Sequence, residues 1–510
     1  METGELPVGW EKAELSDICL VNPTVDKSAI ADDLAVSFVP MPAVKAENGA
    51  VDVSATRKFG EVKKGYTPFR EGDVLFAKIT PCMENGKMAV VPALYNGLGF
   101  GSTEFHVLRA HPGICPQFVY YFVSSRAFRH VAEHNMSGAV GQRRVTTPYL
   151  SACKISVPPT AEQHRIVAKI EELFSELDQG AASLRTAREQ LKVYRQSLLK
   201  NAFEGKLTAA WRTAHCDQLE TAAALQQRIA RERQARYQQQ FADWQTAGQA
   251  GPKPKPPKPL PPLTAEELAE LPELPAGWGW ARLLDACEAV VDCHNKTAPY
   301  LSAGIPLVRT PSIRDMRLNF DDSIRYISQE TYAHWSRRCP PLPGDILFTR
   351  EAPMGEAALI PEGKMVCMGQ RIMLLRPGKF LSGKYLLCAT QNPFFKKISD
   401  KVAVGTGVKH LRVGDVERLV FPICSQLEQQ EIADQLDAKL SEADQLDQTL
   451  ATALQQAETL RQSILKKAFH GQLVKQAKNE EPATVLLERI RAARSTHQPA
   501  RRGRSARSPA

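Results

Sequence analysis

The chain has 510 residues, 43% of them hydrophobic, which is enough for three or four domains with buried cores. No apolar run reaches the ~18 residues needed to cross a bilayer, and the first residues lack a signal-peptide pattern, so we expect a cytoplasmic protein without membrane contact. A net charge of +9 is compatible with nucleic-acid binding, and 11 scattered cysteines without a C-x-x-C pair indicate reduced thiols rather than a structural metal site.

Residues 1–157 form the first predicted globular block. Short apolar runs separated by Gly and Pro favour strands and irregular loops. Strands are predicted at 36–39, 73–79, 88–91, 104–108 and 154–157. Residues 116–133 place Phe and Tyr along one side and are predicted to be helical.

Residues 158–207 carry the pattern of one long helix. Apolar residues, Tyr194 among them, recur in alternating steps of three and four, which favours a coiled coil over an ordinary surface helix. Thr160 and Gln163 have the spacing of a capping box, and Gly205 stands where a helix ends in a left-handed residue. The 44 residues from 161 to 204 would span ~66 Å as a helix.

Residues 208–272 form a connector. Residues 219–244 are rich in Gln, Arg and Ala and are predicted to be helical. Residues 251–262 (GPKPKPPKPLPP) are typical of an extended polyproline spacer. The alternative for this stretch is a proline-rich ligand for a partner.

Residues 273–421 repeat the first block loosely. Residues 274–278 (LPAGW) match residues 6–10 (LPVGW), and residues 343–350 match residues 71–78 around a shared Gly-Asp-x-Leu-Phe sequence. Between such anchors the two blocks differ in sequence and length, so one architecture occurs twice with divergent surfaces.

Residues 422–475 repeat the long helix. Residues 456–473 align with residues 190–207 at an offset of 266 without a gap. Ser425 and Glu428 repeat the capping-box spacing, and Gly471 repeats the end signal. The apolar stripe of this copy includes Leu446 and Leu460.

Two such stripes can bury each other as an antiparallel coiled coil; the alternative is two unrelated helices with separate partners. Residues 476–510 form a basic tail that we expect to be disordered and for which no counterpart is evident. The predicted fold class is α+β, with two globular domains of mixed short strands and helices, related by a pseudo-twofold axis and joined by two long antiparallel helices.

This symmetry suggests a function. Duplex DNA has local twofold symmetry, and paired readers bind half-sites spaced along it. Two unlike readers would recognise two different half-sites, and rigid helices would act as a ruler between them. A separation near one DNA turn, ~34 Å, places both half-sites on one face of the duplex.

The chain resembles the specificity subunits of bacterial type I restriction–modification systems over nearly all of residues 1–475. The motifs that carry the resemblance lie at 158–167, 421–432, 200–207, 466–473 and 102–105, with the Gly-Asp-x-Leu-Phe pair at 72–76 and 344–348. The resemblance implies two target-recognition domains that each read half of a split DNA sequence, and two helical spacer regions. It also implies docking of two methyltransferase subunits and, through them, of restriction (translocase) subunits.

Catalytic motifs are missing from the sequence. Residues 392–395 (NPFF) fall short of the N-P-P-[YF] motif that holds a target adenine, and they look like a helix start. Residues 97–101 (GLGFG) lead into a strand-like run rather than a helix, so a turn is preferred to a phosphate-binding loop. We find no Walker A motif, nuclease signature or metal spacing, and therefore expect a non-catalytic subunit without cofactor or metal.

Candidate DNA contacts combine Lys and Arg for phosphates with polar side chains for base edges. A Gly-rich loop precedes a group of donors in each block, at 138–141 and 405–407. The candidates in the first block are Lys78, Thr80, Asn85, Lys87, Ser102, Thr103, Glu104, Gln142, Arg143 and Arg144. Those in the second are Arg350, Glu351, Gln370, Arg371, Lys409, His410 and Arg412. The alternative for each is a solvated surface group or, for Glu104 and Arg371, an internal ion pair.

Two other functions compete with DNA reading. A coiled-coil scaffold with two protein-binding domains would show no DNA sequence preference in a salt-titrated binding assay. A fused methyltransferase is disfavoured by the missing cofactor loop, and binding of S-adenosylmethionine to the isolated chain would reveal it.

Overall fold

A computed structural model describes residues 6–139, 141–249, 251–258, 260–321 and 324–496. The chain divides into two compact units. Unit 1 comprises Met1–Arg185 and Ala451–Ala510, and unit 2 comprises Thr186–Leu450. Two long helices, α6 (Thr160–Phe203) and α15 (Gln426–Phe469), each begin in one unit and end in the other.

Unit 1 contains two four-stranded sheets. The first has the order β2-β9-β6-β7, with β2 at Cys19–Val21, β9 at Phe105–Ala110, β6 at Val74–Ala77 and β7 at Met88–Val90. The second has the order β4-β3-β8-β5, with β4 at Thr56–Lys58, β3 at Ala35–Val39, β8 at Leu98–Gly101 and β5 at Thr67–Arg70. The helices beside them are α1 (Leu15–Ile18), α2 (Phe59–Val62), α3 (Pro116–Ser124), α4 (Arg126–His134) and α5 (Thr147–Ala152).

Strand β6 shows why the residues that follow Gly-Asp in this sequence are all apolar. Val74 and Phe76 pack into the core shared with α3 and the long helices, whereas Leu75 and Ala77 face the core formed with the second sheet. Alternate side chains of a strand point to opposite faces, so a strand that is buried on both faces must be apolar throughout. The Asp before it, Asp73, is buried and paired with Arg109.

Unit 2 repeats this arrangement. Its main sheet has the order β12-β20-β17-β18, with β12 at Cys287–Asp292, β20 at Ile372–Pro377, β17 at Ile346–Thr349 and β18 at Ala357–Leu359. A smaller sheet has the order β16-β13-β19, with β16 at Arg325–Ile327, β13 at Ile305–Val308 and β19 at Cys367–Met368, and β14 (Ile313–Arg314) pairs with β15 (Arg317–Leu318). The helices are α10 (Leu283–Ala286), α11 (Gln329–Trp335), α12 (Gly383–Gln391), α13 (Pro393–Val402) and α14 (Val413–Arg418).

A two-strand ladder precedes each long helix. β1 (Glu11–Glu14) pairs antiparallel with β10 (Lys154–Val157), which leads into α6. β11 (Gly279–Arg282) pairs antiparallel with β21 (Val420–Ile423), which leads into α15. The first strand of each globular part is therefore hydrogen-bonded to its last.

Most predicted elements of the first block are confirmed, and one is wrong. The predicted strands correspond to β3, β6, β7, β9 and β10, and the predicted helix is present as α3 and α4, broken at Ser125. The expected turn at 97–101 is wrong, because residues 98–101 form β8. Glycine is needed at position 99 because the Phe69 ring packs against the backbone there: a Cβ at Gly99 would lie 2.1 Å from that ring. Asn392 starts a helix as predicted, because its side chain caps α13.

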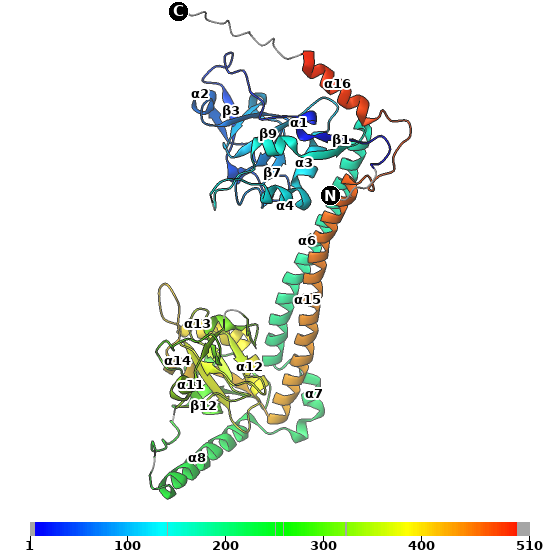
Figure 1. The fold of residues 1–510 in the computed structure, drawn as a ribbon. Helices are drawn as coiled ribbons and strands as arrows, with labels where there is room; N and C mark the ends of the chain where they lie inside the picture. The colour runs from blue at the N-terminus through cyan, green and yellow to red at the C-terminus, as the bar shows by residue number, and fades with distance from the viewer. Residues whose placement is uncertain (1–5, 140, 250, 259, 322–323, 497–510) are drawn as a thin grey trace, which may run out of the picture. The chain divides into compact units, whose positions relative to one another are not determined.

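The long helices pack against each other antiparallel (Figure 1). In unit 1, Arg461 of α15 pairs with Asp178 and lies over the Phe174 ring of α6, with 4.3 Å to the ring centroid. In unit 2, Arg188 of α6 pairs with Asp447 of α15 at 2.8 Å. The bounds of both helices agree closely with those predicted, and the alternative of two unrelated helices is wrong.

The composition of the seam differs from the prediction. Tyr194, Leu446 and Leu460 were assigned to it but are 45%, 49% and 50% exposed. Arg188, Asp447 and Arg461 face the partner helix instead and form ion pairs there. Other residues that the same pattern assigns to the seam, such as Leu191, Leu436 and Leu450, are buried as predicted.

The capping boxes are largely wrong, because their polar side chains bind elsewhere. Thr160 donates to the Gly113 carbonyl, and the Gln163 amide donates to Pro158 O while accepting from Cys115 N. Ser425 does accept from Glu428 N, at 3.2 Å. Gln429 repeats the role of Gln163, since it donates to Cys424 O and accepts from Ser382 N. These glutamines tie each long helix to the start of α3 or α12.

Each long helix ends against a short motif of the unit it enters. Gly205 and Gly471 both have positive φ, as predicted, of 71° and 68°. A Cβ at Gly205 would lie 2.2 Å from Pro275, and one at Gly471 would lie 2.3 Å from Pro7. The two Leu-Pro-x-Gly-Trp motifs therefore receive the two helix ends in the same way.

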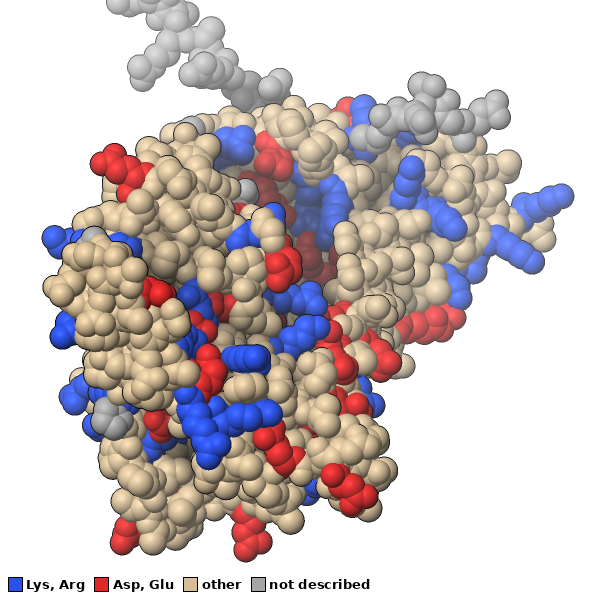
Figure 2. Space-filling view, turned by 90° about the horizontal axis from the view of Figure 1, so that it is seen from below, with Lys and Arg blue, Asp and Glu red and all other residues tan. Residues whose placement is uncertain are grey.

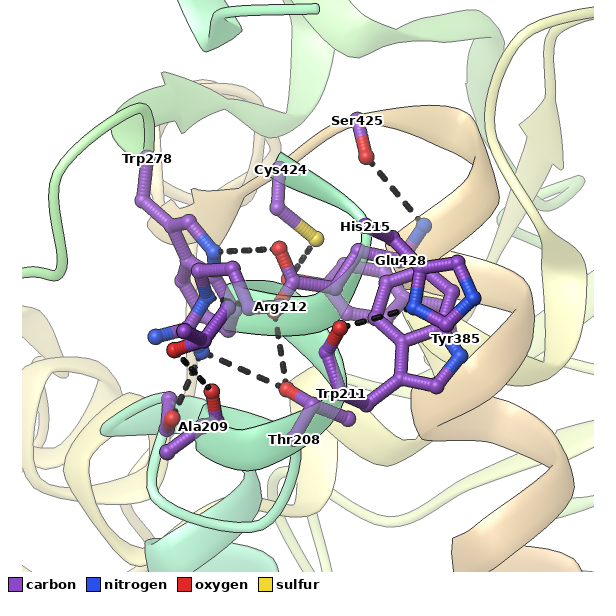
Figure 3. Close-up of polar contacts among 12 residues, drawn as sticks. Thr208, Ala209, Trp211, Arg212, His215, Trp278, Tyr385, Cys424, Ser425 and Glu428 are labelled. Atoms are coloured by element: carbon purple, nitrogen blue, oxygen red, sulfur yellow. Dashed lines mark hydrogen bonds and ion pairs between the residues drawn. The ribbon is translucent and has the colours of Figure 1, made fainter. Parts of the chain in front are cut away.

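In unit 2, the end of α6 at Gly205, the start of α15 and the motif at 274–278 form a joint. A buried carboxylate lies within it (Figure 3). Glu428 is 1% exposed and accepts from Trp278 Nε1 at 2.8 Å, from Thr208 Oγ1 at 2.8 Å and from Arg212 Nε at 2.7 Å. Arg212 also donates to Gly205 O, at the end of α6. Donors from two separate segments thus converge on one acceptor in a third, which links the end of α6, the start of α15 and the start of the second globular part.

Glu162, the counterpart in unit 1, has different surroundings. It is equally buried, and its Oε1 has no hydrogen-bond partner within the described residues. Burial raises the pKa of Glu162, and nearby Glu480 acts in the same direction, whereas Trp10 and Arg165 oppose them. Arg165 instead pairs with Glu480. The joint of unit 1 therefore holds a carboxyl group that is poorly compensated when ionised.

A helix that comes after each long helix in the chain docks beside the same joint. α8 (Ala222–Thr246) buries Leu225 and Ile229, whereas α16 (Ala483–Thr496) buries Leu486 and Ile490. Ala222 N donates to Gly277 O at 2.7 Å, and Ala483 N donates to Gly9 O at 2.9 Å. The expectation of a disordered tail without counterpart is thus wrong for residues 483–496; residues 497–510 lie outside the described residues. The repeat was visible as A-x-x-L-x-x-R-I at 222–229 and 483–490.

The remaining connector elements are short. They are α7 (Ala209–Ala214), the 3-10 turn at Cys216–Gln218 and α9 (Ala265–Ala269). Within the described residues, no helix combines the length and apolar character needed to cross a membrane.

Candidate nucleic-acid interface

In unit 1, the candidate residues gather at one end of the β2-β9-β6-β7 sheet, which is the main sheet of this unit. β6 ends just before Lys78, and β9 begins just after Glu104; the two strands are antiparallel neighbours, so these residues are adjacent. Lys78 N donates to Glu104 O at 2.9 Å. The Gly-rich loop returns to the same place, because Thr80 N donates to Arg143 O at 3.0 Å and Val145 N donates to Lys78 O at 2.9 Å.

The Gly-rich loop of unit 1 is a narrow hairpin in its described part. Ser137 and Arg144 exchange two backbone hydrogen bonds of 3.0 and 2.8 Å. A Cβ at Gly138 would lie 2.9 Å from Gln142 O, so only glycine fits there without a shift. Residue 140 lies outside the described residues.

One ion pair organises this sheet end. Arg144 binds the Glu104 carboxylate through Nε and a terminal nitrogen, both at 2.9 Å. Hydrogen bonding from Arg144 lowers the pKa of Glu104, and the charges of Arg144 and Lys78 add to this. The internal ion pair considered as the alternative role of Glu104 is thus present. It holds a partly exposed guanidinium in one orientation at the sheet end.

Unit 2 builds the same arrangement from different side chains. Arg350 follows β17 as Lys78 follows β6, and its N–H donates to Arg371 O at 2.8 Å. Leu411 N donates to Arg350 O at 3.0 Å, and Val404 and His410 exchange two backbone hydrogen bonds of 2.9 Å each. The second Gly-rich loop therefore returns to the end of the main sheet, as the first one does.

The ion pairs of unit 2 are arranged differently. Arg371, which has a φ of 67°, lies where unit 1 has Glu104, and it pairs with Glu351 at 3.2 Å. The ion-pair alternative for Arg371 is thus also realised. Arg350 pairs with Asp292 at 3.0 Å. Sequence reasoning missed Asp292, because only the pairing of β12 with β20 brings it to this end.

The other candidates are spread around these centres. Arg143 lies 3.9 Å from Glu133, and Lys409 lies 3.8 Å from Asp400, both on exposed surface. Lys87 donates to Met41 O, which directs it toward the second sheet. Thr80, Asn85, Ser102, Thr103, Gln142, Gln370 and Arg412 lie in the loops beside the two sheet ends.

Figure 2 shows Lys and Arg interspersed with Asp and Glu over the face seen from below. A contact with DNA must therefore be argued from individual unpaired cations rather than from a broad basic face. No group of His, Cys, Asp and Glu suited to a metal ion occurs among the described residues.

The sequence of this chain is similar to known proteins over most of its length. A sequence model described as type I restriction modification DNA specificity domain matches residues 7–183 and 319–456. The EcoAI specificity subunit of Escherichia coli is 29% identical over 85% of this chain and 78% of its own length. The EcoKI specificity subunit of E. coli K12 is 24% identical over 97% of both chains.

Solved structures agree on the fold. A chain from a study of complex assembly and conformational transition of the type I R–M system has a TM-score of 0.64 and 21% identity, over 92% of this chain and all of that one. The HsdS subunit from Thermoanaerobacter tengcongensis gives a TM-score of 0.52 at 21% identity, over 92% of this chain and 99% of its own.

Proposed function

Because this chain belongs to the type I restriction–modification DNA specificity family, we propose that its two target-recognition domains read two different halves of one split DNA sequence. The chain is the non-catalytic specificity subunit of such a system. We assign the domains to 1–157 and 273–421, and the spacer helices to 158–207 and 422–475. We also propose that it acts in the cytoplasm.

One observation supports two different half-sites most strongly. Both units bring a Gly-rich loop to the same end of the main sheet, but they place different side chains there. Glu104 pairs with Arg144 of the Gly-rich loop in unit 1, whereas unit 2 has Arg371 at the place of Glu104, and Arg371 pairs with Glu351. Arg favours guanine edges and Glu favours cytosine amino groups, so the two ends should not select the same bases.

The spacer proposal rests on the paired helices. α6 and α15 each run through both units, and their ion pairs fix the register of one against the other. A rigid pair of this kind would keep a constant number of unread base pairs between the half-sites.

The partner proposal rests on apolar residues that the paired helices leave exposed. Val193, Tyr194 and Leu446 lie on the unit 2 part, and Leu460 lies on the unit 1 part. Exposed apolar side chains on long helices are typical of surfaces that a partner covers. We propose double-stranded DNA and two methyltransferase subunits as direct partners, with restriction (translocase) subunits bound through the latter.

Methylome mapping tests this function. A host carrying the chain and its methyltransferase partner should show adenine methylation at one bipartite sequence with a fixed gap. Methylation without sequence dependence, or none that depends on this chain, would favour the scaffold alternative.

A further inference from the structure

The main sheet of unit 2 carries an extension that unit 1 lacks. In unit 1, β2 ends at Val21, opposite Leu108. In unit 2, β12 continues until Asp292 lies opposite Met373, and Cys293 N then donates to Ile372 O at 3.2 Å. The extension brings His294 to the sheet end that also holds Arg371.

Two aromatic rings are stacked at this place. The His294 ring lies on the Trp335 ring of α11, with 4.6 Å between centroids and 29° between planes. His334 lies beside them, 5.4 Å from His294. The His294 side chain is thereby held in place on the surface of the domain.

Cations surround the stack. Lys296 and Arg337 are exposed, and neither forms an ion pair within the described part of the chain. Arg338 donates to Asp292 O at 2.8 Å and to Cys293 O at 2.9 Å, so backbone carbonyls rather than a carboxylate hold it. Burial lowers the pKa of His294, and His334, Arg337, Lys296 and Arg338 all add to the effect. The local potential is therefore positive.

This cluster is continuous with the candidate interface. Arg338 contacts the backbone of Asp292, whose carboxylate pairs with Arg350 at 3.0 Å. Arg350 in turn donates to Leu411 O at 3.2 Å, beside the Gly-rich loop. At the corresponding place in unit 1, Asn22 binds His106 and Thr147 through hydrogen bonds. The cluster is thus a feature of the second domain.

We propose that Lys296, Arg337 and Arg338, supported by the His294–Trp335 stack, bind DNA backbone phosphates beside the half-site read by unit 2. The inference rests on the proposed function. Unpaired, exposed cations gain most from a polyanion, because each phosphate they neutralise releases condensed counterions. The second domain would then hold its half-site with more phosphate contacts than the sheet end alone provides.

The test compares two double variants of the full chain in complex with its methyltransferase partner. K296A/R337A removes two cations of the cluster. K364A/K379A is the matched control, because it removes the same charge from exposed lysines that follow β18 and β20 at the opposite end of the same sheet. DNA binding to the mapped target is measured against salt, and phosphate ethylation interference locates the contacts.

We expect the salt slope of K296A/R337A to fall by up to ~1.8, at ~0.9 per phosphate, with ethylation interference lost only beside the second half-site. A slope equal to that of K364A/K379A would overturn the inference, and so would interference lost at the first half-site. If the unmodified complex shows no preference for its target, the proposed function itself fails, which is a different result from failure of the variant alone.

Discussion

Glu162 and Glu428 occupy the same position in the two long helices, yet they meet different partners. Glu428 accepts from three donors, one of them the guanidinium of Arg212, whereas Glu162 keeps a buried oxygen without a partner in the described structure. The same residue type at one repeated position can therefore stabilise one joint and destabilise the other, because the residues around the two carboxylates differ.

Replacing each of these two glutamates with glutamine should change the unfolding free energy by different amounts. Glu428→Gln leaves Arg212 without a counter-charge and should cost about 3 kcal/mol of unfolding free energy. Glu162→Gln should be neutral or stabilising at pH 7. Denaturant unfolding of both variants measures the difference; equal losses would contradict it.

The pH dependence follows from the raised pKa of Glu162. Below the ordinary value of 4.5, the carboxyl is protonated in both the folded and the unfolded chain, so Glu and Gln should behave alike. As pH rises above 4.5, the unfolded chain ionises first, and the wild type should lose stability relative to Glu162→Gln. Unfolding free energies from pH 4 to 7 test the sign, and a constant difference would refute it.

Arg143 and Arg144 should contribute to DNA affinity rather than to assembly. Replacing both with Ala removes two cations at the end of the main sheet and frees the Glu104 carboxylate. We expect weaker DNA binding and a lower salt slope, with methyltransferase binding unchanged. Salt-titrated fluorescence anisotropy measures this, and an unchanged slope would remove both residues from the interface.

At the scale of elements, the sequence predicted β3, β6 and β9, because each is an unbroken run of mostly apolar, mostly buried residues. It did not predict β4, β5 or β8, which are short and include Pro68 and glycines that fit under Phe69. The Gly-rich loops were also predicted, but the pairing of Arg350 with Asp292 was not, since it depends on strand register.

The register of α6 against α15 gives a prediction about insertions. One heptad added to α6 alone shifts its ion-pairing residues along α15, whereas four residues also rotate them off the seam. The four-residue insertion should therefore destabilise the chain more. Thermal unfolding compares the two, and equal tolerance would argue that the helices do not depend on each other.

The docking helices α8 and α16 should stabilise different units. Leu486→Ala in α16 and Leu225→Ala in α8 each remove a buried side chain, at a cost of roughly 2–5 kcal/mol. Hydrogen exchange should show faster opening around α1 for the first variant and around α10 for the second. The same pattern in both variants would show that the helices are not tied to separate units.

At the scale of the whole molecule, the duplication explains why one chain contains two similar sites. The contacts of the two glutamines and of the glycines at the helix ends occur once in each unit. The differences lie at the sheet ends, in the extension of β12 and in the partners of the buried carboxylates Glu162 and Glu428. Selection on this fold can therefore alter what each domain reads without altering how the halves are held.

The most direct measurement lengthens the spacer. The two units divide after Arg185 in α6 and after Leu450 in α15, and one heptad inserted at both positions keeps the helices in register. Seven residues add ~10.5 Å, about three base pairs. Methylome mapping should then report the same two half-sites with a gap longer by about three base pairs. An unchanged gap, or new half-sites, would contradict the account.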